Sequence, residues 1–99
     1  MKSSGTIQIE FQQVIRQTDK LEKCADDLRK AQRELRELMD DLKGGWAGDS
    51  ANAYLQKCDE LAGKLNKSAT NLDVTAKVIE KSARLYRDAE LAAIRLTQD

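Results

Sequence analysis

The chain contains no histidine and no proline, and its aromatic residues are one Trp, one Phe and two Tyr. The absence of histidine removes the usual general base and the commonest metal ligand of proteins. A Ser-His-Asp or Cys-His catalytic arrangement is therefore excluded. No other cluster of nucleophilic or metal-binding residues is visible in the sequence. We therefore expect a protein that is not an enzyme and that uses neither a cofactor nor a metal ion.

The chain has two cysteines, Cys24 and Cys58, which do not form a C-x-x-C pattern. Without a histidine they cannot complete a zinc site within one chain. We expect both to be small, buried apolar residues. If the chain folds back at Trp46, the two cysteines lie about 15 Å apart along the helix axis, too far for a disulfide within the chain. A disulfide between Cys24 of one copy and Cys58 of another stays open as an alternative.

Lys plus Arg and Asp plus Glu both count 17, and the balance holds in each half of the chain. Such a sequence has no basic stripe for phosphate groups, which argues against nucleic acid as a partner. The apolar runs are too short to span a bilayer, and the N-terminal residues lack the apolar core of a secretory signal peptide. Composition alone therefore indicates a cytosolic protein without stable membrane insertion.

The residues from about 7 to 43 have the pattern of one long helix. It follows a short irregular start, with Ser3, Ser4 or Thr6 as its N-cap. Large apolar residues then recur every seven positions, at Ile7, Val14, Leu21, Leu28, Leu35 and Leu42. A strict seven-residue repeat is typical of a helix that packs along its whole length against another at a shallow angle.

The residues from about 50 to 90 show a second helical pattern with the same spacing. One row consists of Ala51, Cys58, Leu65, Leu72, Ile79 and Tyr86, and a neighbouring row of Leu55, Ala62, Ala69, Ala76 and Ala83. A row of alanines lets another helix approach closely, and the larger residues fill the space between the helices. Gly63 lies inside this pattern, where it costs about 1 kcal/mol of helix stability relative to Ala. A glycine at this position could mark a close crossing of helices.

The stretch 44–48, with the sequence Gly-Gly-Trp-Ala-Gly, separates the two helical patterns. Lys43 and Gly44 are typical of a helix end, with Gly44 in the left-handed conformation. Asp49 or Ser50 is then expected to cap the second helix. The sequence therefore predicts a turn of about five residues over 44–48.

So short a connection predicts an all-α, antiparallel helix-turn-helix hairpin that forms one domain over residues 1–99. The tail, from about 91 to 99, either continues the second helix or stays loose until a partner orders it. Each apolar stripe is wider than one neighbouring helix can cover, so two identical or similar hairpins are expected to pair into a four-helix bundle. The predicted core of the hairpin and the dimer is Val14, Leu21, Leu28, Leu35, Leu42, Leu65, Leu72 and Ile79.

The tripeptide Trp46-Ala47-Gly48 lies centrally in a proline-free helical chain of 99 residues. In this position it resembles the signature of the WXG family of small type VII secretion substrates, also called Esx or early-secreted-antigen-like proteins. The resemblance covers essentially the whole chain. It implies export as a folded pair without a cleaved signal peptide, so that a protein cytoplasmic before export becomes a secreted one. It also makes Trp46 and Gly48 one part of the export signal.

The stretch Tyr86-Arg87-Asp88-Ala89-Glu90 matches the Y-x-x-x-D/E signal that this family carries near the C-terminus. On a helix, Tyr86 and Glu90 are one turn apart on one face, so a docking groove can read both. By itself the string is common, and Tyr86 could instead be the last core residue of the helical seam. The resemblance implies that Tyr86 and Glu90 are the second part of the signal, and that the membrane ATPase of the secretion apparatus recognises the C-terminal segment.

We therefore expect a non-enzymatic protein that a bacterial type VII system exports as a folded homodimer and that acts through protein–protein binding. A close alternative makes the chain one half of a heterodimer, as an export chaperone or adaptor for a larger secreted toxin or another WXG protein. Direct action on membranes is less favoured, because the polar faces carry both signs of charge and the Trp lies in the turn. A cytosolic coiled-coil scaffold is the remaining alternative.

Overall fold

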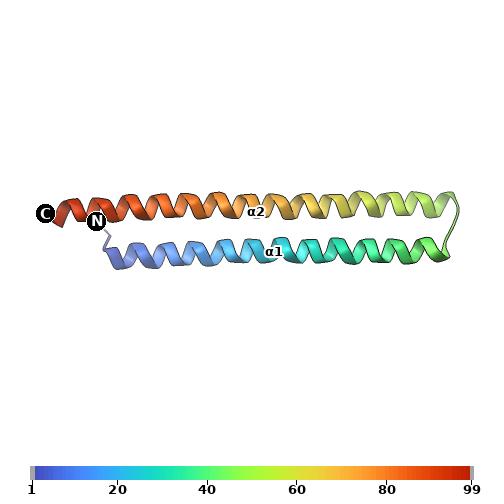
Figure 1. Cartoon of the computed structure of the whole chain (residues 1–99), viewed down its shortest axis with the longest axis horizontal. Coiled ribbons are helices and arrows are strands. Elements are labelled where there is room, and N and C mark those ends of the chain that lie inside the picture. Colours follow the sequence, from blue (N-terminus) through green and yellow to red (C-terminus); the bar gives the residue numbers. More distant parts are fainter. Residues whose placement is uncertain (1, 99) are drawn as a thin grey trace. The chain divides into compact units, whose positions relative to one another are not determined.

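The computed structural model describes residues 2–98 and consists of two long helices joined by a short connection (Figure 1). Helix α1 spans Ser4–Gly45 and helix α2 spans Asp49–Gln98. Residues 2–98 contain no strand, and the predicted all-α helix-turn-helix is confirmed. Met1 and Asp99, the first residue of the expected irregular start and the last of the expected tail, lie outside the described residues.

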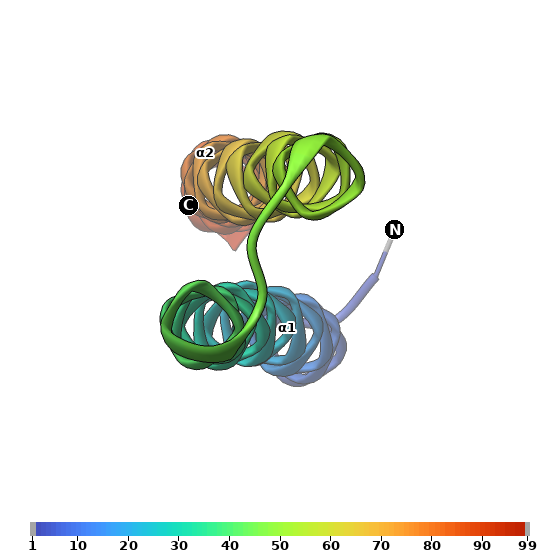
Figure 2. The same cartoon turned by 90° about the vertical axis from the view of Figure 1, so that its right-hand side faces the viewer.

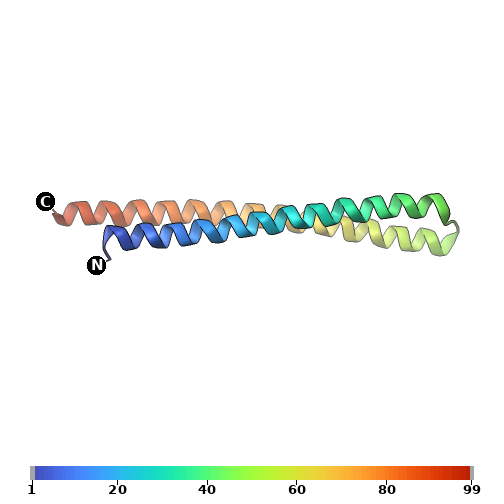
Figure 3. The ribbon, with the colours of Figure 1, turned by 90° about the horizontal axis from the view of Figure 1, so that it is seen from below.

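The chain divides into two compact units, each of which pairs a segment of α1 with a segment of α2. Unit 1 combines the residues up to Glu22 with those from Asp73 onward, and unit 2 is the continuous stretch Lys23–Leu72. Within each unit the two segments lie side by side and run in opposite directions (Figure 1, Figure 3). Unit 2 contains the connection, and Figure 2 shows it joining the end of α1 to the start of α2.

Helix α1 begins at Ser4, earlier than the predicted start at about residue 7, because Ser3 caps it. The Ser3 hydroxyl oxygen accepts a hydrogen bond from the backbone N–H of Thr6 at 3.1 Å. The Ser3 carbonyl accepts a second one from the N–H of Ile7, also at 3.1 Å. These bonds satisfy N–H groups of the first turn that have no partner inside the helix. Of the three candidate caps, Ser3 is the one that the structure uses.

Helix α1 also ends later than the sequence predicts, because Gly44 and Gly45 both belong to it. The N–H of Trp46 still donates to the carbonyl of Leu42 at 2.9 Å, so the helical hydrogen bonds continue to the end of the glycine pair. The expected left-handed conformation at Gly44 is therefore wrong. Among the described residues the positive φ occurs at Gly48, at 112°, where a side chain would be strained.

The start of α2 is set by Gly48, and not by a side-chain cap from Asp49 or Ser50 as predicted. Both of these residues lie inside α2. The carbonyl of Gly48 accepts the first helical hydrogen bond, from the N–H of Asn52 at 3.0 Å. Asp49 occupies the first helical position, where its negative charge interacts favourably with the positive end of the helix dipole.

Helix α2 continues through the tail that the sequence left open and reaches Gln98. The tail contains neither glycine nor proline, so no residue in it breaks the helix. Leu91 and Ile94 are half-buried, whereas Leu96 is 78% exposed. The last turns of α2 therefore present a helical surface with an exposed apolar residue.

The innermost layer between the helices consists mainly of small residues. In α2 the buried residues are Ala51, Ala62, Ala69 and Ala76, each with no exposed surface. In α1 they are Ile7, Phe11, Thr18, Ala25 and Met39. The Thr18 hydroxyl donates to the carbonyl of Ile15 at 2.7 Å, so this buried polar group is satisfied. Alanine side chains let the two backbones approach closely along this layer.

Gly63 does not mark a close crossing of helices in unit 2. It is exposed, and a Cβ atom placed on it would meet no atom within 4 Å. No part of the chain within residues 2–98 comes so close to residue 63 that a glycine is required there. Nothing in this part of the chain therefore offsets the conformational cost of Gly63 in α2.

Candidate functional site

The side chain of Trp46 packs on the beginning of α2. Its ring centroid lies 5.5 Å from that of Tyr54, with the two ring planes tilted by 54°. Tilted aromatic pairs at this separation are favourable. Trp46 is 39% exposed and Tyr54 is 65% exposed. The turn therefore presents a pair of aromatic rings that are only partly covered by the chain itself.

Unit 2 has an ion pair on one side and two exposed leucines on the opposite side. Arg36 of α1 donates from Nη1 to the carboxylate of Asp59 in α2 at 2.9 Å. Leu38 and Leu61 each follow one of these residues by two positions, which is about 200° around the helix. They therefore leave unit 2 on the opposite side, where they are 52% and 50% exposed. We call this side the open face of unit 2.

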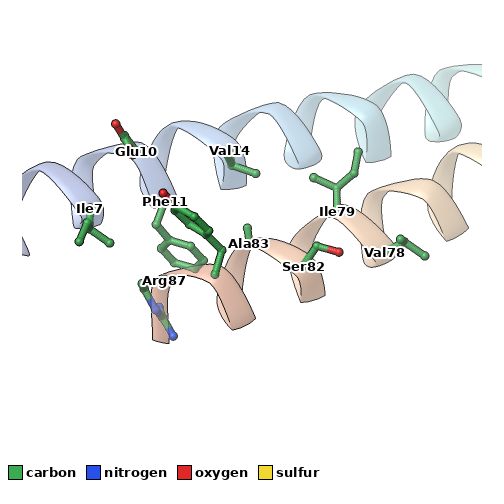
Figure 4. Close-up of a pocket in the computed structure, with 10 residues that line it drawn as sticks. Ile7, Glu10, Phe11, Val14, Val78, Ile79, Ser82, Ala83 and Arg87 are labelled. Atoms are coloured by element: carbon green, nitrogen blue, oxygen red, sulfur yellow. The ribbon is translucent and has the colours of Figure 1, made fainter. Parts of the chain in front are cut away.

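Unit 1 contains a groove of about 410 Å³ between its two helical segments (Figure 4). Its apolar lining is Ile7, Phe11, Val14, Val78, Ile79, Ala83 and Tyr86, and its polar lining is Glu10, Ser82 and Arg87. Figure 4 shows Ile7 and Phe11 pointing from α1 toward α2. A mainly apolar groove with Ser82 and Ala83 as small wall residues suits an apolar side chain better than a charged ligand.

Two arginines of α2 lie beside the ring of Phe11. The guanidinium carbon of Arg87 lies 4.2 Å from the ring centroid, and that of Arg84 lies 5.9 Å from it. Cation–π contacts of this kind contribute about 0.5–1 kcal/mol at exposed sites. Arg87 also donates from Nε to Asp88 at 3.0 Å. Arg87, which lies between Tyr86 and Glu90, thus contributes to the stability of unit 1 through its contact with Phe11.

The N-terminal end of the described chain is tied to the rim of the groove. Lys2 donates from Nζ to the carboxylate of Glu10 at 2.9 Å. This hydrogen bond raises the pKa of Lys2, and the charge of Glu10 and the hydroxyl of Tyr86 add to the shift. Lys2 thus places a positive charge next to Glu10 at the rim of the groove.

The two predicted parts of the export signal belong to different units. Trp46 and Gly48 are in unit 2, and Tyr86 and Glu90 are in unit 1. Tyr86 is 51% exposed and lines the groove, while Glu90, one turn further along α2, is half-buried. Each part thus offers some surface to a partner, and the role of all four residues in export stays a prediction.

The eight predicted core residues form two rows that are half-buried in the single chain. We call them the leucine rows: Val14, Leu21, Leu28, Leu35 and Leu42 in α1, and Leu65, Leu72 and Ile79 in α2. They flank the buried alanine layer and keep part of their apolar surface in water. Their burial in a dimer stays a prediction.

The two cysteines are free, and Cys24 is exposed where the sequence predicts burial, whereas Cys58 is half-buried. Cys24 lies two heptads before Leu38 in α1, so its exposure follows from sharing the row that leads to the open face of unit 2. Within residues 2–98, no group of three or more Cys, Asp or Glu side chains is placed to hold a metal ion. Over the same residues, neither helix has an apolar stretch long enough to cross a membrane.

Sequence reasoning missed the row of α2 that begins with Tyr54 and Leu61. These large apolar residues are seven positions apart and lie next to the predicted seam. Their spacing was the available signal, because two such residues on one row widen the apolar stripe in that direction. In the structure both are at least half exposed, which marks this row as a surface available to a partner.

The family described as proteins of 100 residues with WXG matches residues 6–91 of the chain. No curated protein and no solved structure matches the chain. The matched stretch includes the turn, the Tyr86 to Glu90 motif and both leucine rows. Members of the family are small helical secreted proteins of type VII secretion that are not enzymes and that pair with each other for export. Because the match extends over most of both helices, this chain belongs to the WXG100 family.

Proposed function

We propose that this protein forms a homodimer in which the leucine rows of each copy are covered by the other, giving a four-helix bundle. The half-buried state of these rows in the single chain is the observation that carries the proposal. Covering a fully exposed Leu side chain contributes about 1.5–3 kcal/mol. The leucine rows keep part of their apolar surface in water. Covering that surface with a second hairpin therefore adds a large favourable contribution to the free energy of association.

The total exposed surface supports the same proposal. A compact monomer of this mass exposes about 5,650 Å², whereas this chain exposes 7309 Å². The difference of about 1,650 Å² is twice the roughly 800 Å² that each partner buries in a standard stable interface. Pairing between members of the family is consistent with an interface of this size.

We propose further that the dimer is exported by a bacterial type VII system without a cleaved signal peptide and then acts by binding other proteins. Trp46 with Gly48, and Tyr86 with Glu90, are the two parts of the proposed signal. Family membership supports this proposal, as does the partial exposure of Trp46 and Tyr86. The segment 91–98, which continues α2, is the proposed contact for the membrane ATPase.

Native mass, measured on the chain expressed alone, tests the homodimer. A folded dimer is the expected result. A monomeric and partly unfolded chain would instead favour the heterodimer, in which this protein is an export chaperone or adaptor for a related WXG chain or a larger secreted toxin. Leakage of liposomes at neutral pH would favour action on membranes.

Export itself is tested by comparing the secreted fraction of variants in a host that carries a type VII system. Trp46→Ala and Glu90→Gln should reduce secretion and leave the dimer intact. Asp88→Asn is the matched control for Glu90→Gln, because it removes a neighbouring charge outside the motif positions and should be secreted normally. Ending the chain after Glu90 should abolish export, and normal secretion of that truncated chain would remove the tail from the proposal.

A further inference from the structure

One row of α2 at seven-residue spacing changes from large to small side chains along the helix. Its members are Tyr54, Leu61, Ser68, Thr75, Ser82 and Ala89. Tyr54 and Leu61 belong to unit 2 and are 65% and 50% exposed. The four small residues are also exposed. Because its large residues are at one end and its small ones at the other, the row is complementary to itself when two copies run in opposite directions.

We propose that α2 of one copy packs antiparallel on α2 of a second copy, with Leu61 of each copy entering the groove of the other at Ser82. The proposal rests on the homodimer proposed above and specifies its contact. In this register Tyr54 of one copy lies against Ala89 of the other, so large residues meet small ones. If the two helices ran in the same direction, Leu61 would meet its own equivalent, and Ser82 would face Ser82 across an unfilled space.

The groove of unit 1 offers the space that Leu61 needs. It has a volume of about 410 Å³, and its lining is mostly apolar. Ser82 and Ala83 keep its α2 wall low, while Phe11 and Val14 line it from α1 (Figure 4). Filling it removes from water both the exposed half of Leu61 and the apolar lining of the groove.

The neighbouring row of α2 carries charges that fit the same register. It contains Lys57 and Lys64 in unit 2, and Val78 and Leu85, which are 58% and 63% exposed, in unit 1. In the antiparallel register Lys57 lies beside Leu85 of the other copy, and Lys64 beside Val78. The aliphatic part of each lysine then covers an exposed apolar side chain and its ammonium group stays in water. Helices running in the same direction would place lysine against lysine, which like charges oppose.

Disulfide trapping in the full chain tests this register. In a background with Cys24→Ala and Cys58→Ala, one variant carries Leu61→Cys and another carries Ser82→Cys. The two are mixed in denaturant, refolded together and oxidised. We expect a disulfide-linked dimer only from the mixture, because the bond needs Cα atoms within about 7 Å, and each position lies about 30 Å from its own equivalent in this register. Val74→Cys mixed with Leu61→Cys is the matched exposed control and should not be trapped.

Two other trapping patterns would overturn the register. Self-linking of Leu61→Cys would place equivalent residues together, and linking of Leu61→Cys to Leu38→Cys in place of Ser82→Cys would place α2 over α1 of the second copy. Either pattern, together with a dimeric native mass, refutes the contact between Leu61 and Ser82 but not the homodimer. A monomeric native mass refutes both the contact and the homodimer.

Exchanging the two side-chain sizes gives a second, independent readout. Leu61→Ser should raise the dimer Kd about 30-fold, and Ser82→Leu should raise it as well, because two leucines then compete for one space. The chain with both substitutions restores one large and one small residue at each contact, so its Kd should return toward the original value. Far-UV circular dichroism checks that every variant keeps its helices. A double variant as weak as the two single effects combined would show that the residues do not meet.

Discussion

Replacing Leu61 by Ala is expected to weaken self-association while leaving the hairpin folded, and the equivalent replacement of Val74 is not. Leu61 and Val74 both lie on α2 and are exposed to a similar degree, 50% and 55%. They differ in the direction they face. Leu61 is on the open face of unit 2, opposite the pair that Arg36 makes with Asp59, whereas Val74 is on neither the leucine rows nor the row of Leu61. The two substitutions therefore separate the loss of a partner contact from the loss of an exposed apolar group.

The magnitude follows from the surface that a partner can still cover. Complete burial of a Leu side chain contributes about 1.5–3 kcal/mol, and half of that, about 1 kcal/mol, is left for the exposed half of Leu61. A two-fold symmetric dimer makes the contact twice, so the loss is about 2 kcal/mol per dimer, or roughly a 30-fold increase in Kd. Within a single hairpin the same substitution should cost only a few tenths of a kcal/mol, because Leu and Ala are both good helix formers.

Sedimentation equilibrium over a range of protein concentrations measures the Kd of both variants, and far-UV circular dichroism at high concentration checks their helix content. The expected result is a weaker dimer for Leu61→Ala and an unchanged Kd for Val74→Ala, with full helicity in both. Equal Kd values for the two variants would show that the open face of unit 2 is not covered in the dimer. The reasoning from exposure to interface would then be refuted.

Three further substitutions test the packing within the chain. Gly63→Ala should stabilise the protein by about 1 kcal/mol, because the added Cβ meets no atom within 4 Å, and thermal denaturation should show a higher Tm; an unchanged or lower Tm would contradict this. Ala69→Leu should lower the free energy of unfolding by about 1–3 kcal/mol, since Ala69 has no exposed surface; urea denaturation measures the loss, and a neutral outcome would show that the alanine layer has spare room. Arg87→Ala should cost about 0.5–1 kcal/mol through its contact with Phe11 at 4.2 Å, whereas Arg95→Ala, at an exposed position, is the control expected to change little.

The seven-residue repeats were sufficient to predict two long helices, because the spacing of apolar residues reports which side chains share a face. They did not show which of two neighbouring rows is innermost. In α2, Ala62, Ala69 and Ala76 of one row are fully buried, while Leu65 and Leu72 of the neighbouring row are half-buried. In α2 side-chain size decides this order, because the helices approach most closely where the side chains are smallest. A count of apolar residues gives both rows similar weight and misses that difference.

The ends of the helices were predicted less well than their existence. Gly44 was expected to stop α1, but glycine can remain helical while the hydrogen-bond ladder continues, and the N–H of Trp46 still reaches the carbonyl of Leu42. The backbone reversal needs only one positive φ, and Gly48 supplies it. Gly44 and Gly48 can both adopt a positive φ. Which of them does so depends on where the second helix begins. The exposure of Cys24 is a related case, because residue type favours burial but the row it occupies faces outward.

Small residues inside and larger ones outside make folding and pairing of the proposed dimer one coupled process. Alanines bring the helices close but bury little apolar surface each, so the single hairpin gains only part of the stabilisation available from its sequence. The leucine rows supply the rest when a second copy covers them. Apparent stability should then depend on protein concentration, because association stabilises the folded state by mass action. The Tm deficit of a variant such as Leu61→Ala, which loses a contact between copies, should be smallest at low concentration, where both proteins are monomeric, and should grow as higher concentration drives the original protein into dimers. Ala69→Leu, which disturbs the layer inside one hairpin, should show its Tm deficit at every concentration.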